Sequence, residues 1–311
     1  MFKLRIGYVI SGIATGLVLL FGFIATLPDG KLHIIFCDVG QGDATYVRFP
    51  DGRDMLIDGG PNDKVLNCLG KHMPFWDRSI NLVVLTHPQK DHMQGLISVI
   101  DRYSVDYFVR SEVGNDTEGY KKLMDVVERK RVSQKFVTTG ERITVGSTSL
   151  TTLWPSEEQV AKAGDSARRP LAGSQGDALG SGVLGASIVG DLNDYSVVFW
   201  LRYGNFDALF PGDADTHVEE KYRGVSLADG TIELLKVPHH GSKTGMSETY
   251  LDWLKPQLAV ISVGKNSYGH PAKEVLATLA TRAIQAKRTD EEGDIEIISD
   301  GKEWEAATVD R

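Results

Sequence analysis

The segment VVLTHPQKDHMQGL, residues 83–96, places His87, Asp91 and His92 directly after an apolar run. The run predicts a buried strand, and the apolar spacing in the following GLISVIDRY predicts a helix. A loop between a strand and a helix can direct imidazole and carboxylate groups at one point, and such groups bind zinc, manganese or iron. On its own, this segment is weak support for a metal site.

Further segments have the same character, because each places polar groups at the end of an apolar strand. They are CDVGQGDA with Asp38 and Asp43, LIDGG with Asp58, ALFPGDAD with Asp213, LKVPHHGSKTG with His239 and His240, and SYGHP with His270. Strand ends are rigid and the loops beyond them are free to vary, so functional sites are often built there. The segments together predict one shared site.

The order of the predicted elements indicates an α/β fold. LHIIFCDV, ATYVRF and DMLIDGG read as a β-meander, after which strands alternate with amphipathic helices, and residues 294–309 read as a closing hairpin. Two blocks of strands, each followed by a helix, predict a two-layered β-sheet core with helices outside. The glycine-rich stretch from Gly164 to Asn193 predicts a long loop, either a flap over the site or an insertion.

The first residues predict a membrane anchor. Ile6 to Leu27 carry no charge, and Lys3 and Arg5 precede them. Because no cleavage site follows, we expect residues 1–28 to remain as a transmembrane helix, with a single domain over residues 31–311 outside the cytoplasm. That domain is acidic, since the chain has 42 acidic and 34 basic residues, and this excludes a global basic surface for duplex nucleic acid.

The two cysteines, Cys37 and Cys68, have no spacing that requires a disulfide. A disulfide is possible in an oxidising compartment. The apolar strand HIIFC favours a buried free thiol at Cys37.

Taken in order, DVGQGDA, LIDGG, THPQKDH, FPGDAD, VPHHGSK and YGHP resemble the motifs of the metallo-β-lactamase superfamily. Within that superfamily they resemble the hydrolase domain of ComEC-type competence (DNA-internalisation) proteins. The resemblance runs from about Leu32 to Leu279. It implies an αββα sandwich with metal ions in a groove at the shared edge of the two sheets.

The resemblance also implies roles for individual residues. His87, Asp91 and His92 match the signature His-x-(His or Asp)-x-Asp-His, and Asp213 matches an aspartate that bridges two ions. The pair His239 and His240 matches the last ligand motif, with the choice between them open. The residues expected behind the ligands, where they would orient them, are Asp38, Asp43, Asp58 and Gln89.

The sequence departs from the superfamily pattern at two points. Gln89 stands where relatives have His or Asp, and no histidine lies between His92 and His217. We therefore expect one firmly held ion, zinc or manganese, and at most one loosely held second ion.

Hydrolysis is the chemistry expected of such a site, because a divalent ion acidifies water and polarises a substrate oxygen. The residues expected to take part in catalysis are Asp91, Asp213, Lys243 and His270. Ser242 is interpreted as a turn hydroxyl and not as a nucleophile. Three functions compete: a phosphodiesterase acting on single-stranded DNA or another phosphodiester, a hydrolase of a lactone, phosphocholine ester or β-lactam, and a non-catalytic metal-binding interaction domain.

Overall fold

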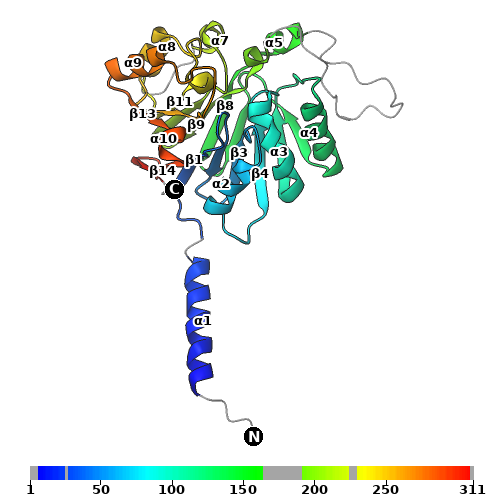
Figure 1. The fold of residues 1–311 in the computed structure, drawn as a ribbon, viewed down its shortest axis with the longest axis vertical. Coiled ribbons are helices and arrows are strands. Elements are labelled where there is room, and N and C mark those ends of the chain that lie inside the picture. The colour runs from blue at the N-terminus through cyan, green and yellow to red at the C-terminus, as the bar shows by residue number, and fades with distance from the viewer. Residues whose placement is uncertain (1–5, 25–26, 164–190, 224–229, 309–311) are drawn as a thin grey trace, which may run out of the picture.

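The computed structural model describes residues 6–24, 27–163, 191–223 and 230–308 (Figure 1). Most of the predicted glycine-rich loop, residues 164–190, therefore lies outside the described residues. The described strands form two sheets. In spatial order the first sheet contains β15 (Trp304–Thr308), β14 (Ile295–Ser299), β1 (Leu32–Phe36), β2 (Thr45–Arg48), β3 (Asp54–Ile57), β4 (Ser79–Leu85), β5 (Ser104–Arg110) and β6 (Ser133–Phe136). The second contains β13 (Gln285–Arg288), β12 (Leu258–Ile261), β11 (Leu234–Lys236), β10 (Phe206–Phe210), β9 (Val198–Tyr203), β8 (Thr148–Trp154) and β7 (Arg142–Val145).

Helices cover the outer face of each sheet (Figure 1). The first sheet packs against α2 (Lys64–His72), α3 (Lys90–Arg102) and α4 (Glu118–Arg129). The second packs against α7 (Thr216–Tyr222), α8 (Glu248–Leu254) and α9 (Lys273–Thr281). The shorter helical segments are α5 (Glu157–Lys162), α10 (Thr289–Glu292), and the 3-10 turns η1 (Leu192–Tyr195) and η2 (Pro238–Gly241).

The layers follow from the alternation of side chains along the strands. In β1, Ile34 and Phe36 belong to the apolar core between the two sheets, whereas Ile35 belongs to the core beneath α2, α3 and α4. Because both faces of the sheets are covered, the central strands are buried on both sides, as in β3 and β10, where every residue is buried. The predicted α/β fold with a two-layered sheet core and outer helices is confirmed.

The direction of the strands explains why distant segments meet. The predicted meander of β1, β2 and β3 is antiparallel, and the closing hairpin of β14 and β15 joins it through β1. From β3 to β6, and again from β10 to β13, the neighbouring strands are parallel. The carboxyl ends of parallel strands lie at the same edge of a sheet, so the loops after β3, β4, β10 and β11 gather there.

Helix α1 (Ile6–Ile24) stands apart from the sheets (Figure 1). Its described large apolar side chains are exposed, among them Tyr8, Ile13 and Leu17. Within the described part of the chain, no helix combines the length and the apolarity that membrane crossing requires. The transmembrane helix predicted within residues 1–28 is therefore not confirmed.

Cys37 and Cys68 form a disulfide, which corrects the interpretation of Cys37 as a free thiol. Their separation of 31 positions does not by itself indicate a pairing. They meet because α2 packs across the end of β1 and brings their Cα atoms within 5.8 Å. The bond ties α2 to the start of the loop that carries Asp43.

Replacing both cysteines by alanine is expected to lower the free energy of unfolding by about 3–4 kcal/mol, because the open chain gains the entropy of a loop of this length when it unfolds. Urea unfolding of the oxidised protein and of the Cys37→Ala/Cys68→Ala variant measures the difference. Equal midpoints and slopes would show that the bond does not stabilise the fold.

Candidate metal centre

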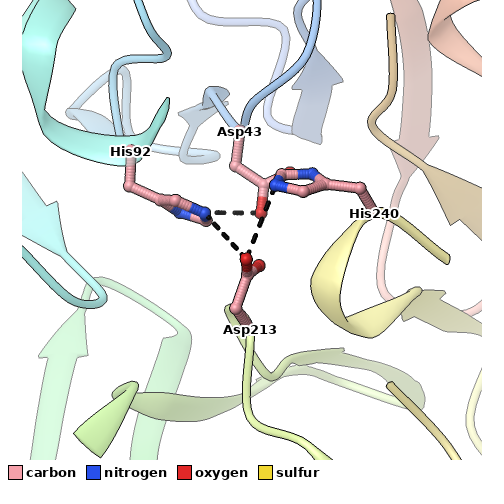
Figure 2. Close-up of side chains that lie close together, drawn as sticks. All are labelled: Asp43, His92, Asp213 and His240. Atoms are coloured by element: carbon pink, nitrogen blue, oxygen red, sulfur yellow. Dashed lines mark ion pairs between the residues drawn. The ribbon is translucent and has the colours of Figure 1, made fainter. Parts of the chain in front are cut away.

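The residues singled out in the sequence gather at one edge of the sandwich, where strands of both sheets end. Asp58 follows β3, His87 follows β4, Asp213 follows β10, and His240 lies in the turn after β11. Figure 2 shows four side chains from different segments converging there: Asp43, His92, Asp213 and His240.

Two imidazole rings and two carboxylates meet at the centre of this group. The Nε2 atom of His92 lies 3.2 Å from Oδ2 of Asp213, and Nε2 of His240 lies 3.5 Å from the same oxygen. Asp91, at the start of α3, places its Oδ2 atom 3.4 Å from Nε2 of His240. Asp91, His92, Asp213 and His240 thus direct four donor groups at one point.

Several buried atoms of this group have no hydrogen-bond partner: Nε2 of His92, Nε2 of His240, Oδ1 of Asp213 and both side-chain oxygens of Asp43. Leaving such atoms unpaired costs free energy, so buried polar groups almost always have a partner. Unpaired imidazole nitrogens that face carboxylate oxygens are a suitable donor set for a divalent metal ion. The residues therefore fit a metal, and the group Asp91, His92, Asp213 and His240 would hold it.

The far side of each ring is held by a hydrogen-bond partner. Nδ1 of His92 lies 2.8 Å from Oδ2 of Asp58, whose carboxylate also accepts from the backbone N–H and the hydroxyl of Thr86 at 2.8 and 2.7 Å. Nδ1 of His240 donates to the carbonyl of Ser262 at 2.9 Å. Such contacts fix the tautomer and leave Nε2 free for a metal. Asp58 thus has the orienting geometry that the sequence predicted.

Asp43 lies close enough to His92, Asp213 and His240 to be counted as a ligand by distance alone, since donor atoms of all four fall within 4.8 Å. Its contacts to the histidines are nevertheless on their Nδ1 side, at 3.4 Å from His240 and 3.8 Å from His92. The Nε2 atoms face the other way, toward Asp213. We therefore place Asp43 on the Nδ1 side of the two rings, and its predicted orienting role stays a prediction.

The backbone is strained where it presents these side chains. Asp58, His239 and His240 all have positive φ angles, of 58°, 49° and 52°. This left-handed region is unfavourable for residues other than glycine, and such residues collect at functional sites. The two consecutive left-handed residues in η2 turn the chain so that His240 points inward.

Electrostatics in the group favour a cation. Burial alone would lower the pKa of His240, but the carboxylates of Asp213 and Asp43 outweigh it and raise the pKa to about 10. Burial opposes ionisation of Asp213, yet His92 and His240 hold its pKa well below the usual range. The carboxylates of Asp213 and Asp43 therefore stay ionised and stabilise a positive charge beside the ring of His240.

A second ion would find few donors. His87 is buried and its Nε2 atom has no hydrogen-bond partner. Burial, together with nearby His92, lowers its pKa to about 3, so the ring is neutral. Gln89 is held by a hydrogen bond from its Nε2 atom to Oδ1 of Asn193 at 2.8 Å. His87 thus offers a free imidazole nitrogen, whereas Gln89 offers only the neutral oxygen of an amide whose nitrogen is bonded to Asn193.

Other predicted site residues lie outside the ligand group. His239 is a quarter exposed, with Nδ1 3.0 Å from Oδ1 of Asp215 and Nε2 3.9 Å from Oδ2 of Asp213, whereas Nε2 of the buried His240 lies 3.5 Å from that oxygen, so the geometry favours His240 as the ligand. Lys243 is on the surface and pairs with Glu274 at 3.2 Å, which leaves its predicted catalytic role without structural support. Asp38 accepts a hydrogen bond from the backbone of Gly40 and lines a separate pocket.

Sequence reasoning missed Lys236, the last residue of β11. It is 3% exposed, and its ammonium group forms an ion pair with Asp43 inside the site. Burial lowers its pKa, but Asp43 and Asp213 outweigh burial and raise it. The available signal was a lysine inside the otherwise apolar run IELLKV.

A pocket of about 540 Å³ opens beside Asp91, His239 and His240. Lys90 and Lys265 line it and are exposed, and Tyr268 and His270 form part of its wall. Asp91 is the only carboxylate among its lining residues in the described part of the chain. An acidic protein thus has a locally basic entrance to its candidate metal site.

Comparison with known families gives the same assignment. The family model described as "Metallo-beta-lactamase superfamily" matches residues 37–265, which include every ligand discussed above. The chain belongs to this superfamily. It is a metal-dependent hydrolase of that superfamily, and its candidate metal site contains the cluster of Asp43, His92, Asp213 and His240.

The chain is also similar to individual proteins. It is 26% identical over 300 residues to ComE operon protein 3 of Bacillus subtilis, covering 91% of this chain and 34% of that protein. It is 35% identical over 104 residues to competence protein ComA of Neisseria gonorrhoeae, covering 33% of this chain and 15% of that protein. The metallo-beta-lactamase fold protein YhfI from Bacillus subtilis matches with a TM-score of 0.47 and 9% identity, covering 82% of this chain and 95% of that one. The chain spans about a third or less of the length of these curated relatives.

Proposed function

We propose that the protein hydrolyses phosphodiesters, with single-stranded DNA as the polymer, using a bound zinc or manganese ion. The observation that carries this proposal is the charge of the pocket. Two lysines and three histidines line it, whereas Asp91, one of the proposed metal ligands, is its sole carboxylate among the described lining residues. In a chain with a net charge of −8, such a pocket favours an anionic substrate.

The side chains of the pocket have separate tasks. Asp91, His92, Asp213 and His240 would hold the ion, which when bound would polarise a substrate oxygen and acidify a water molecule. Lys90 and Lys265 offset charge on the phosphoryl oxygens.

His270 lines the pocket with its ring 5.6 Å from that of His239. Its partial burial and the neighbouring His239 lower its pKa, so it is neutral at pH 7. It is placed to offer a neutral hydrogen bond to the leaving oxygen.

Two relatives support nucleic acid as the polymer by their names: competence protein ComA of Neisseria gonorrhoeae, and recombination protein 2 of Haemophilus influenzae, which is 31% identical to this chain over 106 residues. They are much longer than this chain, so their whole activity does not transfer to it. The pocket has no feature built for a lactone or a β-lactam in particular. Both are kept as outcomes of the test.

The test is a comparison of substrates with one enzyme preparation. The full chain, loaded with manganese or zinc, is assayed on bis(p-nitrophenyl) phosphate, a lactone and nitrocefin. The proposal predicts hydrolysis of the diester and little or none of the other two. If the protein readily hydrolyses the lactone or nitrocefin and leaves the diester uncleaved, the proposed phosphodiesterase activity is wrong. The protein would then be a lactonase or a β-lactamase. A protein that holds metal and cleaves nothing would be an interaction domain.

Tyr268 offers a surface on which a nucleobase of the substrate can stack. Its ring is 75% exposed at the pocket, 5.8 Å from the ring of His270. The loop is rigid, because Oδ1 of Asn266 accepts from the backbone N–H groups of Tyr268, Gly269 and His270. A fixed, exposed aromatic ring beside lysines is a platform on which a base can stack.

We expect Tyr268→Ala to raise the KM for a single-stranded oligonucleotide roughly tenfold with little change in kcat, because stacking contributes about 1–3 kcal/mol per base. Tyr268→Phe should keep the KM of the unaltered protein. Phe75→Ala is the matched control, since Phe75 is 77% exposed and lies outside the pocket. Equal KM values for Tyr268→Ala and Phe75→Ala would rule the platform out.

We also propose that the domain acts outside the cytoplasm, attached to a membrane by residues 1–28. The exposed apolar side chains of α1 support attachment. The Cys37–Cys68 bond supports an oxidising compartment, where disulfides persist. A reporter fused after Arg311 that is active only in the cytoplasm would contradict this location.

A further inference from the structure

Lys236 lies at the centre of the site with its charge buried. Its ammonium group forms an ion pair with Oδ2 of Asp43, donates to the carbonyl of Gly212 at 2.9 Å, and lies 3.6 Å from Oδ1 of Asp213. An ammonium group has three N–H donors and no acceptor. Three acceptors therefore surround it, as ligands would surround a small cation.

The two oxygens of Asp213 face different partners. Oδ2 faces the Nε2 atoms of His92 and His240, at 3.2 and 3.5 Å. Oδ1 faces Lys236 and has no hydrogen-bond partner of its own. Asp213 matches the aspartate that bridges two metal ions in the superfamily. In this chain it lies between the ligand histidines of one ion and the ammonium group of Lys236.

We propose that the ammonium group of Lys236 takes the place of a second metal ion, so that the chain holds a single ion at Asp91, His92, Asp213 and His240. This accounts for the weak donor set beside His87, where Gln89 supplies only a neutral amide oxygen and no carboxylate or imidazole.

The charges in the site agree with this role. Four carboxylates, those of Asp43, Asp58, Asp91 and Asp213, are grouped around the two ligand histidines. One divalent ion offsets half of their charge, and Lys236 offsets part of the remainder. Because the side chain is 3% exposed, it acts on the carboxylates and not on a substrate. Lys236 is therefore a positioning residue.

The experiment measures metal, so its result does not depend on the substrate of the enzyme. The full chain is loaded with manganese or zinc, dialysed, and analysed for ions per chain, and the dissociation constant is measured by competition with a chelator. We expect the unaltered protein to retain one ion. Lys236→Met should bind ions at least about tenfold more tightly and retain more than one, because a positive charge beside Asp213 has been removed.

Three further variants separate charge from structure. Lys236→Arg keeps the charge and should retain one ion, and Lys121→Met removes an exposed lysine far from the site and should also match the unaltered protein. Asp43→Asn/Lys236→Met removes the ion pair as a unit and should return the affinity to within about threefold of the unaltered protein.

Two results would overturn the proposal. The first is retention of two ions by the unaltered protein, a measurement that needs no variant. The second is a Lys236→Met protein that is folded by circular dichroism and binds ions no more tightly than the unaltered chain. If the protein cleaves no substrate but shows the expected ion counts, the proposed function is wrong and this inference on Lys236 is still supported.

Discussion

Asp213→Ala is expected to abolish diester hydrolysis and to weaken ion binding in the same protein. Asp213 is the carboxylate that both ligand histidines face, at 3.2 and 3.5 Å. Without it the ion loses a charged ligand and the two imidazoles lose the group that they contact. We expect a rate loss of at least about a thousandfold, which corresponds to about 4 kcal/mol of transition-state stabilisation.

The measurement is kcat/KM on bis(p-nitrophenyl) phosphate together with ion content after dialysis. Asp215→Asn is the matched control, because Asp215 lies two residues away, pairs with His239 and contacts no ligand histidine at Nε2. It should keep its ion and most of its activity. If Asp213→Ala keeps both the ion and the rate, the ligand assignment is wrong.

The second large effect separates two adjacent histidines that the sequence could not distinguish. His240→Ala should lose at least about a hundredfold in ion affinity, since it removes a buried ligand whose ring is fixed by Ser262. His239→Ala should change ion affinity by less than about threefold, because its ring is partly exposed and its Nε2 atom lies farther from Oδ2 of Asp213, at 3.9 Å.

Competition with a chelator gives both dissociation constants. The paired design controls for the backbone, because both residues have left-handed φ angles and either substitution perturbs the same turn. Equal losses in the two variants would mean that the turn, and not the donor atom of His240, determines ion binding. A larger loss in His239→Ala would reverse the assignment.

Much of this site could be predicted because each ligand follows a recognisable apolar strand. The strands before Asp58, His87 and Asp213 are evident in the sequence, and polar residues that close such strands gather at one edge. An orienting role for Asp58 could be predicted from the sequence for the same reason. Its contact with Nδ1 of His92, at 2.8 Å, is the geometry that the position implied.

Other features depend on packing that a sequence does not display. The choice of His240 over His239 is set by two left-handed residues that a histidine pair does not signal. Cys37 and Cys68 meet because a helix crosses a strand end. Lys236 looks like the polar end of a strand, yet it points inward because Asp43, from a loop almost two hundred positions earlier, supplies its partner.

The proposed phosphodiesterase requires a bound ion for cleavage. The most direct measurement is cleavage of a single-stranded oligonucleotide by the full chain as isolated, after chelation, and during stepwise return of manganese or zinc. We expect chelation to stop cleavage. As ions are returned, the cleavage rate should rise and reach a plateau near one ion per chain. Cleavage that persists in the fully chelated protein would contradict this expectation, as would a metal-loaded chain that leaves the oligonucleotide intact.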